Sequence, residues 1–221
     1  MDRFTTTLRG LLNSGEELDS PRNKAILVYQ LMIDRGATGS PWIAFTDAIQ
    51  GYAETDLFIR DIVAPSYHGA SVYGHRGDAS IVLFNRDLCR EDRDLPDTAR
   101  STILHQPDPN GDRRKTYVFR AYSPSAGMKL LLSQRPRLLV WDYLDDQMIR
   151  QLELSIKTAI MRGRVDHLIF LVKPGQMATM SAKISALLNR HHFSNEIKIS
   201  WNEIINTANR IQIRDLFGFL L

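Results

Sequence analysis

Residues 167–190 read HLIFLVKPGQMATMSAKISALLNR, a short apolar run followed by a turn and an amphipathic stretch. The apolar run, 167–172, predicts a buried strand, and the stretch over 176–190 predicts a helix. A strand followed by a helix is the unit of parallel sheets, because two parallel strands need a long crossover connection. This part of the chain therefore indicates an α/β fold.

The same alternation recurs on either side of these residues. Further apolar runs span 116–121, 138–141 and 197–201, and helical patterns span 125–133, 146–162 and 202–213. We therefore expect the C-terminal portion to form a mostly parallel sheet of four or five strands covered by helices. The predicted fold class is α/β, with a helical N-terminal portion packed against this sheet.

The first 65 residues have helical patterns. Ser20-Pro21 and Ser40-Pro41 each place a capping hydroxyl before a proline, which is favoured at the first position of a helix. Apolar spacing predicts helices over 2–13, 21–35, 42–49 and 55–63. One strand is predicted after them, over 79–84.

A charged stretch divides the chain. Residues 86–115 mix arginines with aspartates and one glutamate and contain Pro96, Pro107 and Pro109, so they offer little apolar surface to bury. We interpret 86–115 as a solvated connecting segment. It separates a mainly helical, acidic subdomain, 1–85, from a basic α/β subdomain, 116–221, although the two can also form one globular domain.

Charge is distributed unevenly between the two parts. Residues 1–112 contain 11 Lys and Arg against 17 Asp and Glu, a balance of −6, whereas residues 113–221 contain 17 against 8, a balance of +9. Clustered Lys and Arg attract phosphates and acidic surfaces. The sequence therefore predicts a non-enzymatic assembly protein that binds nucleic acid or another polyanion, and a solubilising basic surface is the alternative. The candidate contacts are Arg113, Arg114, Lys115, Arg120, Lys129, Arg135, Arg137, Arg162, Arg164, Arg190 and His191.

A different function follows from three carboxylates. Asp142, Asp145 and Asp146 come directly after the apolar run 138–141. Open α/β sheets bind ligands at the carboxyl ends of their strands, and Mg²⁺ prefers carboxylate oxygens. The alternative function is thus a Mg²⁺-dependent nuclease or phosphotransferase, and only this alternative requires a cofactor. The other interpretation of these aspartates is as helix caps and a turn residue.

Composition restricts location and partners. Cys89 is the single cysteine, so no intramolecular disulfide can form, and we expect a reducing, cytoplasmic setting. No apolar run approaches the ~20 residues that span a bilayer. The six histidines have no compact metal-ligand spacing, so no metal site is predicted from them.

Apolar residues close the sequence. They either dock on the core of their own chain or form contacts in a homo-oligomer, and a purely structural oligomeric scaffold is a third possible function. The predicted oligomer contacts are Leu216, Phe217, Phe219, Leu220 and Leu221.

Overall fold

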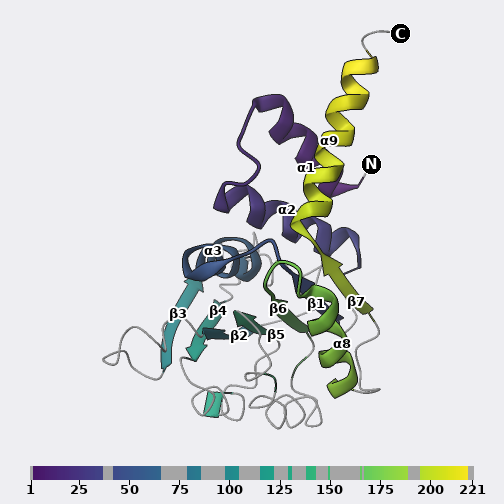
Figure 1. Cartoon of the computed structure of the whole chain (residues 1–221). Helices are drawn as coiled ribbons and strands as arrows, with labels where there is room; N and C mark the ends of the chain where they lie inside the picture. The colour runs from purple at the N-terminus through teal and green to yellow at the C-terminus, as the bar shows by residue number, and fades with distance from the viewer. Residues whose placement is uncertain are drawn as a thin grey trace.

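A single seven-stranded sheet with helices on both faces organises the chain (Figure 1). The computed structural model describes residues 2–36, 42–65, 79–85, 98–104, 115–121, 129–130, 138–142, 149, 165, 167–188 and 195–218. The sheet order is β3-β4-β2-β5-β6-β1-β7. Its strands are β1 Trp42–Thr46, β2 Ala79–Asn85, β3 Thr98–Leu104, β4 Lys115–Ala121, β5 Leu138–Asp142, β6 His167–Leu171 and β7 Asn195–Ile199.

All neighbouring strands are parallel except β3 and β4, which are antiparallel. The predicted α/β class with a parallel sheet is therefore confirmed. Residues 115–199 supply four parallel strands. Strands β1 and β2, from the first 85 residues, lie between them, and β3 extends the sheet at one edge. The described helical segments are α1 Arg3–Ser14, α2 Pro21–Asp34, α3 Gly51–Leu57, the π-helix η1 Phe58–Val63, α8 Met177–Leu188 and α9 Trp201–Gly218.

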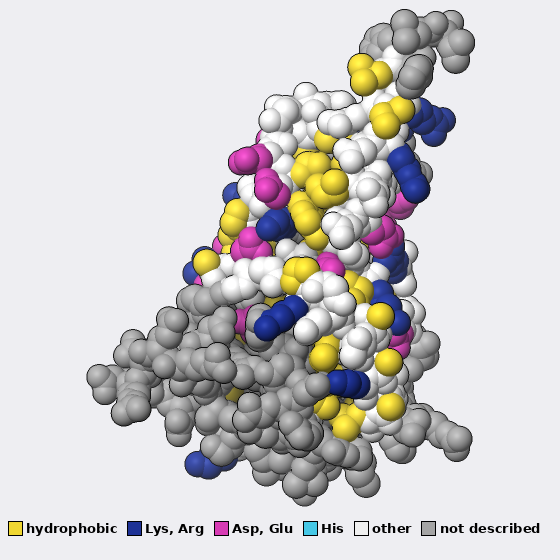
Figure 2. Space-filling view, viewed as in Figure 1, with side chains coloured by type: hydrophobic (Ala, Val, Ile, Leu, Met, Phe, Trp, Pro, Cys, Tyr) yellow, Lys and Arg dark blue, Asp and Glu magenta, His cyan; other side chains and the backbone are white. Residues whose placement is uncertain are grey.

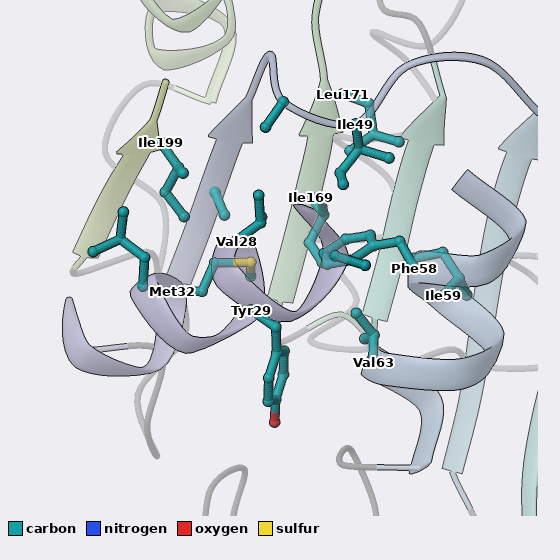
Figure 3. Close-up of a cluster of buried hydrophobic side chains, with 14 of the residues drawn as sticks. Val28, Tyr29, Met32, Ile49, Phe58, Ile59, Val63, Ile169, Leu171 and Ile199 are labelled. Carbon is teal, nitrogen blue, oxygen red and sulfur yellow. The ribbon is translucent and has the colours of Figure 1, made fainter. Parts of the chain in front are cut away.

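Both faces of the sheet are buried under helices. On the first face, Ala44, Val140 and Ile169 pack with residues of α2 and η1, and Figure 3 shows Val28, Met32, Phe58 and Val63 lying over the strands. Helix α9 contributes Ile204 and Ala208 to the same cluster. Strands that are buried on both faces carry near-continuous apolar runs, which explains the sequence of β5 and β6.

The cluster on the second face contains three stacked aromatic side chains. Phe170 stacks between Phe45 and Trp141, with ring centroids 5.2 Å and 4.9 Å apart. Met180 and Ile184 of α8 cover this cluster. Because successive side chains of a strand point to opposite faces, β1, β5 and β6 serve both clusters.

The predicted helix over 42–49 is wrong, because residues 47–49 are not helical either and α3 begins at Gly51. Residues 42–46 form β1, which lies between β6 and β7, and all five of its side chains are buried. A short apolar run that is buried all round has the same pattern in a helix and in a strand. Ser40-Pro41, the cap that suggested a helix, lies outside the described residues.

Strand β3 corrects the interpretation of 86–115 as a connection without regular structure. Its seven residues pair with β4 from Thr98↔Ala121 to Leu104↔Lys115. Two strands, β1 and β2, also come from 1–85, where one was expected. The last strand covers 195–199 instead of 197–201, and Trp201 already belongs to α9.

Helix starts follow the predicted capping chemistry. Ser20 accepts a hydrogen bond from the backbone N–H of Asn23 at 3.3 Å, with Pro21 at the first helical position. The carboxylate of Asp2 accepts one from the backbone N–H of Thr5 at 2.6 Å and so caps α1. The helices predicted over 125–133 and 146–162 lie outside the described residues, except for Lys129, Leu130 and Ile149, which are helical.

None of the helices that the structure describes is both long enough and apolar enough to cross a membrane.

Candidate functional site

Two polar contacts join α3 to the sheet on its first face. The hydroxyl of Thr55 donates a hydrogen bond to Oδ1 of Asp142 at 3.2 Å, and both residues are buried, with 0% and 2% of their surfaces exposed. The next residue of α3, Asp56, forms an ion pair with Arg120 of β4. Consecutive residues of one helix thus contact two strands that are separated in the sheet by β2.

The alternation of side chains along the strands explains these contacts. Leu138 and Val140 lie in the cluster under α2 and η1, so Asp142, two residues further along β5, faces the same helices. Val118 belongs to this cluster as well, and Arg120 follows it on β4 by the same step of two. The polar side chains therefore occupy the ends of apolar rows, where the rows reach the carboxyl edge of the sheet.

Asp142 is the last residue of β5, the central strand of the seven. The structure confirms the predicted position of Asp142 at the carboxyl edge of the sheet. The residue does not lie in a surface turn, because its carboxylate is buried. A buried carboxylate is costly unless hydrogen bonds satisfy it, and Thr55 supplies one of them. Asp145 and Asp146 lie outside the described residues. Among the residues that are described, no three His, Cys, Asp or Glu side chains come close enough to hold a metal ion.

The π-helix η1 begins three residues after Thr55. Such helices are rare and occur often at functional sites. Arg60 of η1 contacts Asp56 at 3.4 Å and Asp61 at 2.7 Å. The hydrogen bond and the positive charge of Arg60 keep the pKa of Asp61 below its ordinary 3.8. Asp56, Arg60, Asp61 and Arg120 thus form a charged cluster beside the buried Asp142.

The loops after β1 and β6 lead to opposite faces of the sheet. The loop after β1 continues into α3 on the first face, and the loop after β6 continues into α8 on the second. Such a divergence is the place where open α/β sheets form a ligand crevice. Here Gln50 bridges it, because its side-chain N–H donates to the backbone oxygens of Asp47 at 2.8 Å and Val172 at 3.0 Å. The carboxylate of Asp47 also has a partner, because it accepts a hydrogen bond from the backbone N–H of Trp201 at 2.8 Å and so caps α9.

The predicted basic contacts are only partly described. Arg120 is largely buried and bound to Asp56, whereas Lys129 is exposed, so these two do not share one surface. Lys115 begins β4, and nothing about its side chain is described. The remaining candidates lie outside the described residues: Arg113, Arg114, Arg135, Arg137, Arg162, Arg164, Arg190 and His191.

Other exposed basic residues lie on α8, β7 and α9. They are Lys183, Lys198, Arg210 and Arg214. Figure 2 shows acidic and basic side chains interspersed along the side of the molecule that carries α9. Glu196 contacts Lys198 at 2.9 Å and accepts from Ser185 at 2.8 Å, and Arg35 pairs with Glu203. Partial burial raises the pKa of Glu196, but these hydrogen bonds outweigh it and keep that pKa below the ordinary 4.5.

Leu216 is the predicted oligomer contact that the structure describes best. Its side chain is 68% exposed on α9, and Ile213, one turn earlier, is 54% exposed. Phe217 lies in α9 without a described side chain, and Phe219, Leu220 and Leu221 lie outside the described residues. The apolar side chain that sequence reasoning missed is Ile213, because its position in the helical pattern also suits a core residue.

Sequence reasoning also missed Thr55, Asp56 and Gln50. Each is a single polar residue in or beside an amphipathic helix, a pattern that indicates a solvated face. Their partners are 64 to 122 residues away in the sequence, so no local signal points to the contacts. No protein-family model matches this chain, and a search of curated proteins finds no match for it.

Proposed function

We propose that this protein binds a polyanion, with nucleic acid as the first candidate, through the basic residues of 113–221. The observation that carries the proposal is the exposure of Lys183, Lys198, Arg210 and Arg214 on three neighbouring elements. Helix α8 contacts β7 through Ser185 and Glu196, and α9 follows β7 directly. Exposed Lys and Arg side chains can reach backbone phosphates without displacing core contacts.

The ion pairs around β7 reduce the positive charge that is available to bind a polyanion. Near β7, Glu196 balances the charge of Lys198, and Glu203 balances the charge of Arg35. The positive excess therefore comes from Arg210 and Arg214, with Asp215 as the nearby carboxylate. A small excess without a base-reading motif predicts weak binding that does not depend on sequence and falls steeply with salt. Arg120 has no part in the proposal, because it is bound to Asp56.

A salt titration of filter retention with single-stranded and duplex RNA and DNA tests this proposal. The double variant Lys183→Gln with Arg210→Gln should lower the magnitude of the logarithmic salt slope on duplex DNA by about 2, since each phosphate contact contributes about 0.9. The matched control, Arg3→Gln with Arg22→Gln, removes the same charge from exposed positions elsewhere and should leave the slope unchanged. Absence of retention at low salt, or equal slopes for both variants, would contradict the proposal.

The buried contact between Asp142 and Thr55 favours a second candidate, a Mg²⁺-dependent nuclease or phosphotransferase. It places a carboxylate at the carboxyl edge of the central strand, where α/β enzymes bind their ligands. Asp142→Asn should then abolish cleavage or phosphoryl transfer in the presence of Mg²⁺, while the cooperative thermal unfolding transition is kept. Asp19→Asn, an exposed carboxylate between α1 and α2, is the control. If the wild-type protein shows no such activity with nucleic acids or nucleotides, this candidate is eliminated.

The third candidate is a structural scaffold. It uses the exposed Leu216 for contacts between copies and predicts large assemblies without affinity for polyanions. Light scattering across a concentration series distinguishes it from the first proposal. A homo-oligomer and a cytoplasmic location stay predictions, the first from the apolar residues 216–221 and the second from the single cysteine.

A further inference from the structure

The described side chains in the second half of α9 are mostly exposed. Ile204 and Ala208 bury the first half of the helix in the core, and Ile211 packs against the edge of the same cluster. Residues 212–216 are all exposed, and the helix extends past α1 (Figure 1). Ile213 and Leu216 are the large apolar side chains that are exposed in the described part of the chain.

The charges on this half of α9 are arranged asymmetrically. At 100° per residue, Ile213 and Leu216 are neighbours on the helix surface, and Arg210 and Arg214 lie one turn apart on the adjoining strip. Asp215, the one carboxylate of residues 209–216, lines a groove against Leu12 and Asn13 of α1, and Leu216 lines the same groove. An exposed apolar pair is thus flanked by arginines, and Figure 2 shows hydrophobic and basic side chains side by side at this end.

We propose that this end of α9, residues 209–218, is an interfacial anchor for an anionic lipid surface. An anionic bilayer offers acyl chains to Ile213 and Leu216 and negative headgroups to Arg210 and Arg214, which is the pattern of helices that lie in a membrane interface.

Two other occupants fit these residues less well. A second copy of this chain would bring a second pair of arginines to the same apolar patch, where like charges repel. A nucleic acid would pair with Arg210 and Arg214 but leave Ile213 and Leu216 exposed to water. The charge also orients the contact, because Glu16, Glu17 and Asp19, all exposed between α1 and α2, would be repelled by the same surface.

Co-sedimentation of the intact protein with vesicles tests the anchor. Vesicles of equal parts phosphatidylcholine and phosphatidylserine should bind the protein, and vesicles of phosphatidylcholine alone should not. Arg210→Gln with Arg214→Gln should weaken binding roughly 25-fold, because each basic residue near such a surface contributes about 1 kcal/mol and 1.4 kcal/mol is a factor of ten. Arg3→Gln with Arg22→Gln removes the same charge from exposed positions elsewhere and should have a much smaller effect.

A second variant separates lipid binding from the proposed polyanion binding. Ile213→Ser with Leu216→Ser keeps every charge, so it should abolish vesicle binding and leave retention of nucleic acid unchanged. Both side chains are exposed, and circular dichroism should show an unchanged fold. The anchor is refuted if the wild-type protein ignores the anionic vesicles or if this variant binds them as well as the wild type does. If the variant instead turns an oligomer into a monomer with vesicle binding unchanged, the face belongs to a second copy.

Discussion

Thr55 donates a hydrogen bond to Asp142 across 87 residues of sequence and joins α3 to the carboxyl end of the central strand. Asp56, the next residue, pairs with Arg120 on β4. These contacts determine where α3 and η1 lie on the sheet, at the edge where α/β proteins bind ligands. The stability of the helix and the chemistry of the candidate site are therefore linked through the same side chains.

Thr55→Val should test the contact with Asp142. Valine has nearly the same shape but no donor, so the buried carboxylate loses one hydrogen bond. The free energy of unfolding in urea should fall by about 1–3 kcal/mol. Thr55→Ser keeps the hydroxyl and is the control. Equal stability of the valine variant and the wild type would show that other partners satisfy Asp142.

A double-mutant cycle measures the pair between Asp56 and Arg120. Both side chains are mostly buried, with 17% and 16% exposed. Replacing them with Asn and Met, singly and together, should give a coupling energy of about 1–3 kcal/mol in urea unfolding, as for residues that share one network. The matched pair of Arg60 and Asp61 is half exposed and should give less than about 1 kcal/mol. Equal couplings would mean that burial does not strengthen the inner pair.

Gly36→Ala should destabilise the end of α2. Gly36 has a φ of +99°, and an added Cβ would lie 2.7 Å from Nδ2 of Asn195. A side chain in such a backbone conformation costs about 1–3 kcal/mol, and the close contact adds to this. Gly10→Ala is the opposite case, because Gly10 lies inside α1 with no atom within 4 Å of its added Cβ. That change should raise the melting temperature, since alanine is favoured over glycine in a helix by about 0.5–1 kcal/mol.

Asp2 should make α1 sensitive to acid. Hydrogen bonds from the side chain and the backbone N–H of Thr5 keep the pKa of Asp2 below its ordinary 3.8. When folding lowers the pKa of a carboxyl group, the ionised group stabilises the folded protein. This stabilisation is fully present at pH values above the pKa in the unfolded protein, and it is lost as the pH falls through the pKa in the folded protein. Asp2→Ala should therefore cost about 1 kcal/mol at neutral pH.

The difference in the free energy of unfolding between wild type and Asp2→Ala should shrink as the pH is lowered below 3.8. Urea unfolding at neutral pH and at a pH below 3.8 measures this difference. Asp2→Asn keeps an oxygen acceptor without the charge, so its stability relative to Asp2→Ala should not change with pH. A constant difference between aspartate and alanine at all pH values would contradict the capping argument.

Much of the fold follows from local patterns. Alternating apolar runs and amphipathic stretches predicted β4, β5, β6 and α8, and the capping at Ser20-Pro21 predicted α2. The pattern failed at Trp42–Thr46, because a five-residue run buried on both faces has no polar side to reveal its period. It also failed at Thr98–Leu104, where a strand at the sheet edge is surrounded in sequence by charged residues.

The sequence alone determined that this chain forms a parallel α/β sheet, that α1, α2, α8 and α9 begin within a residue of where they do, and that Asp142 lies at the carboxyl end of a strand. Those properties depend on residues within a few positions of one another, through backbone hydrogen bonding and the period of apolar side chains. Only the tertiary structure decided that β1 lies between β6 and β7, that Asp56 binds Arg120 and that Ile213 and Leu216 are exposed. These contacts depend on how distant segments pack, and the energies of alternative packings do not appear in any local pattern.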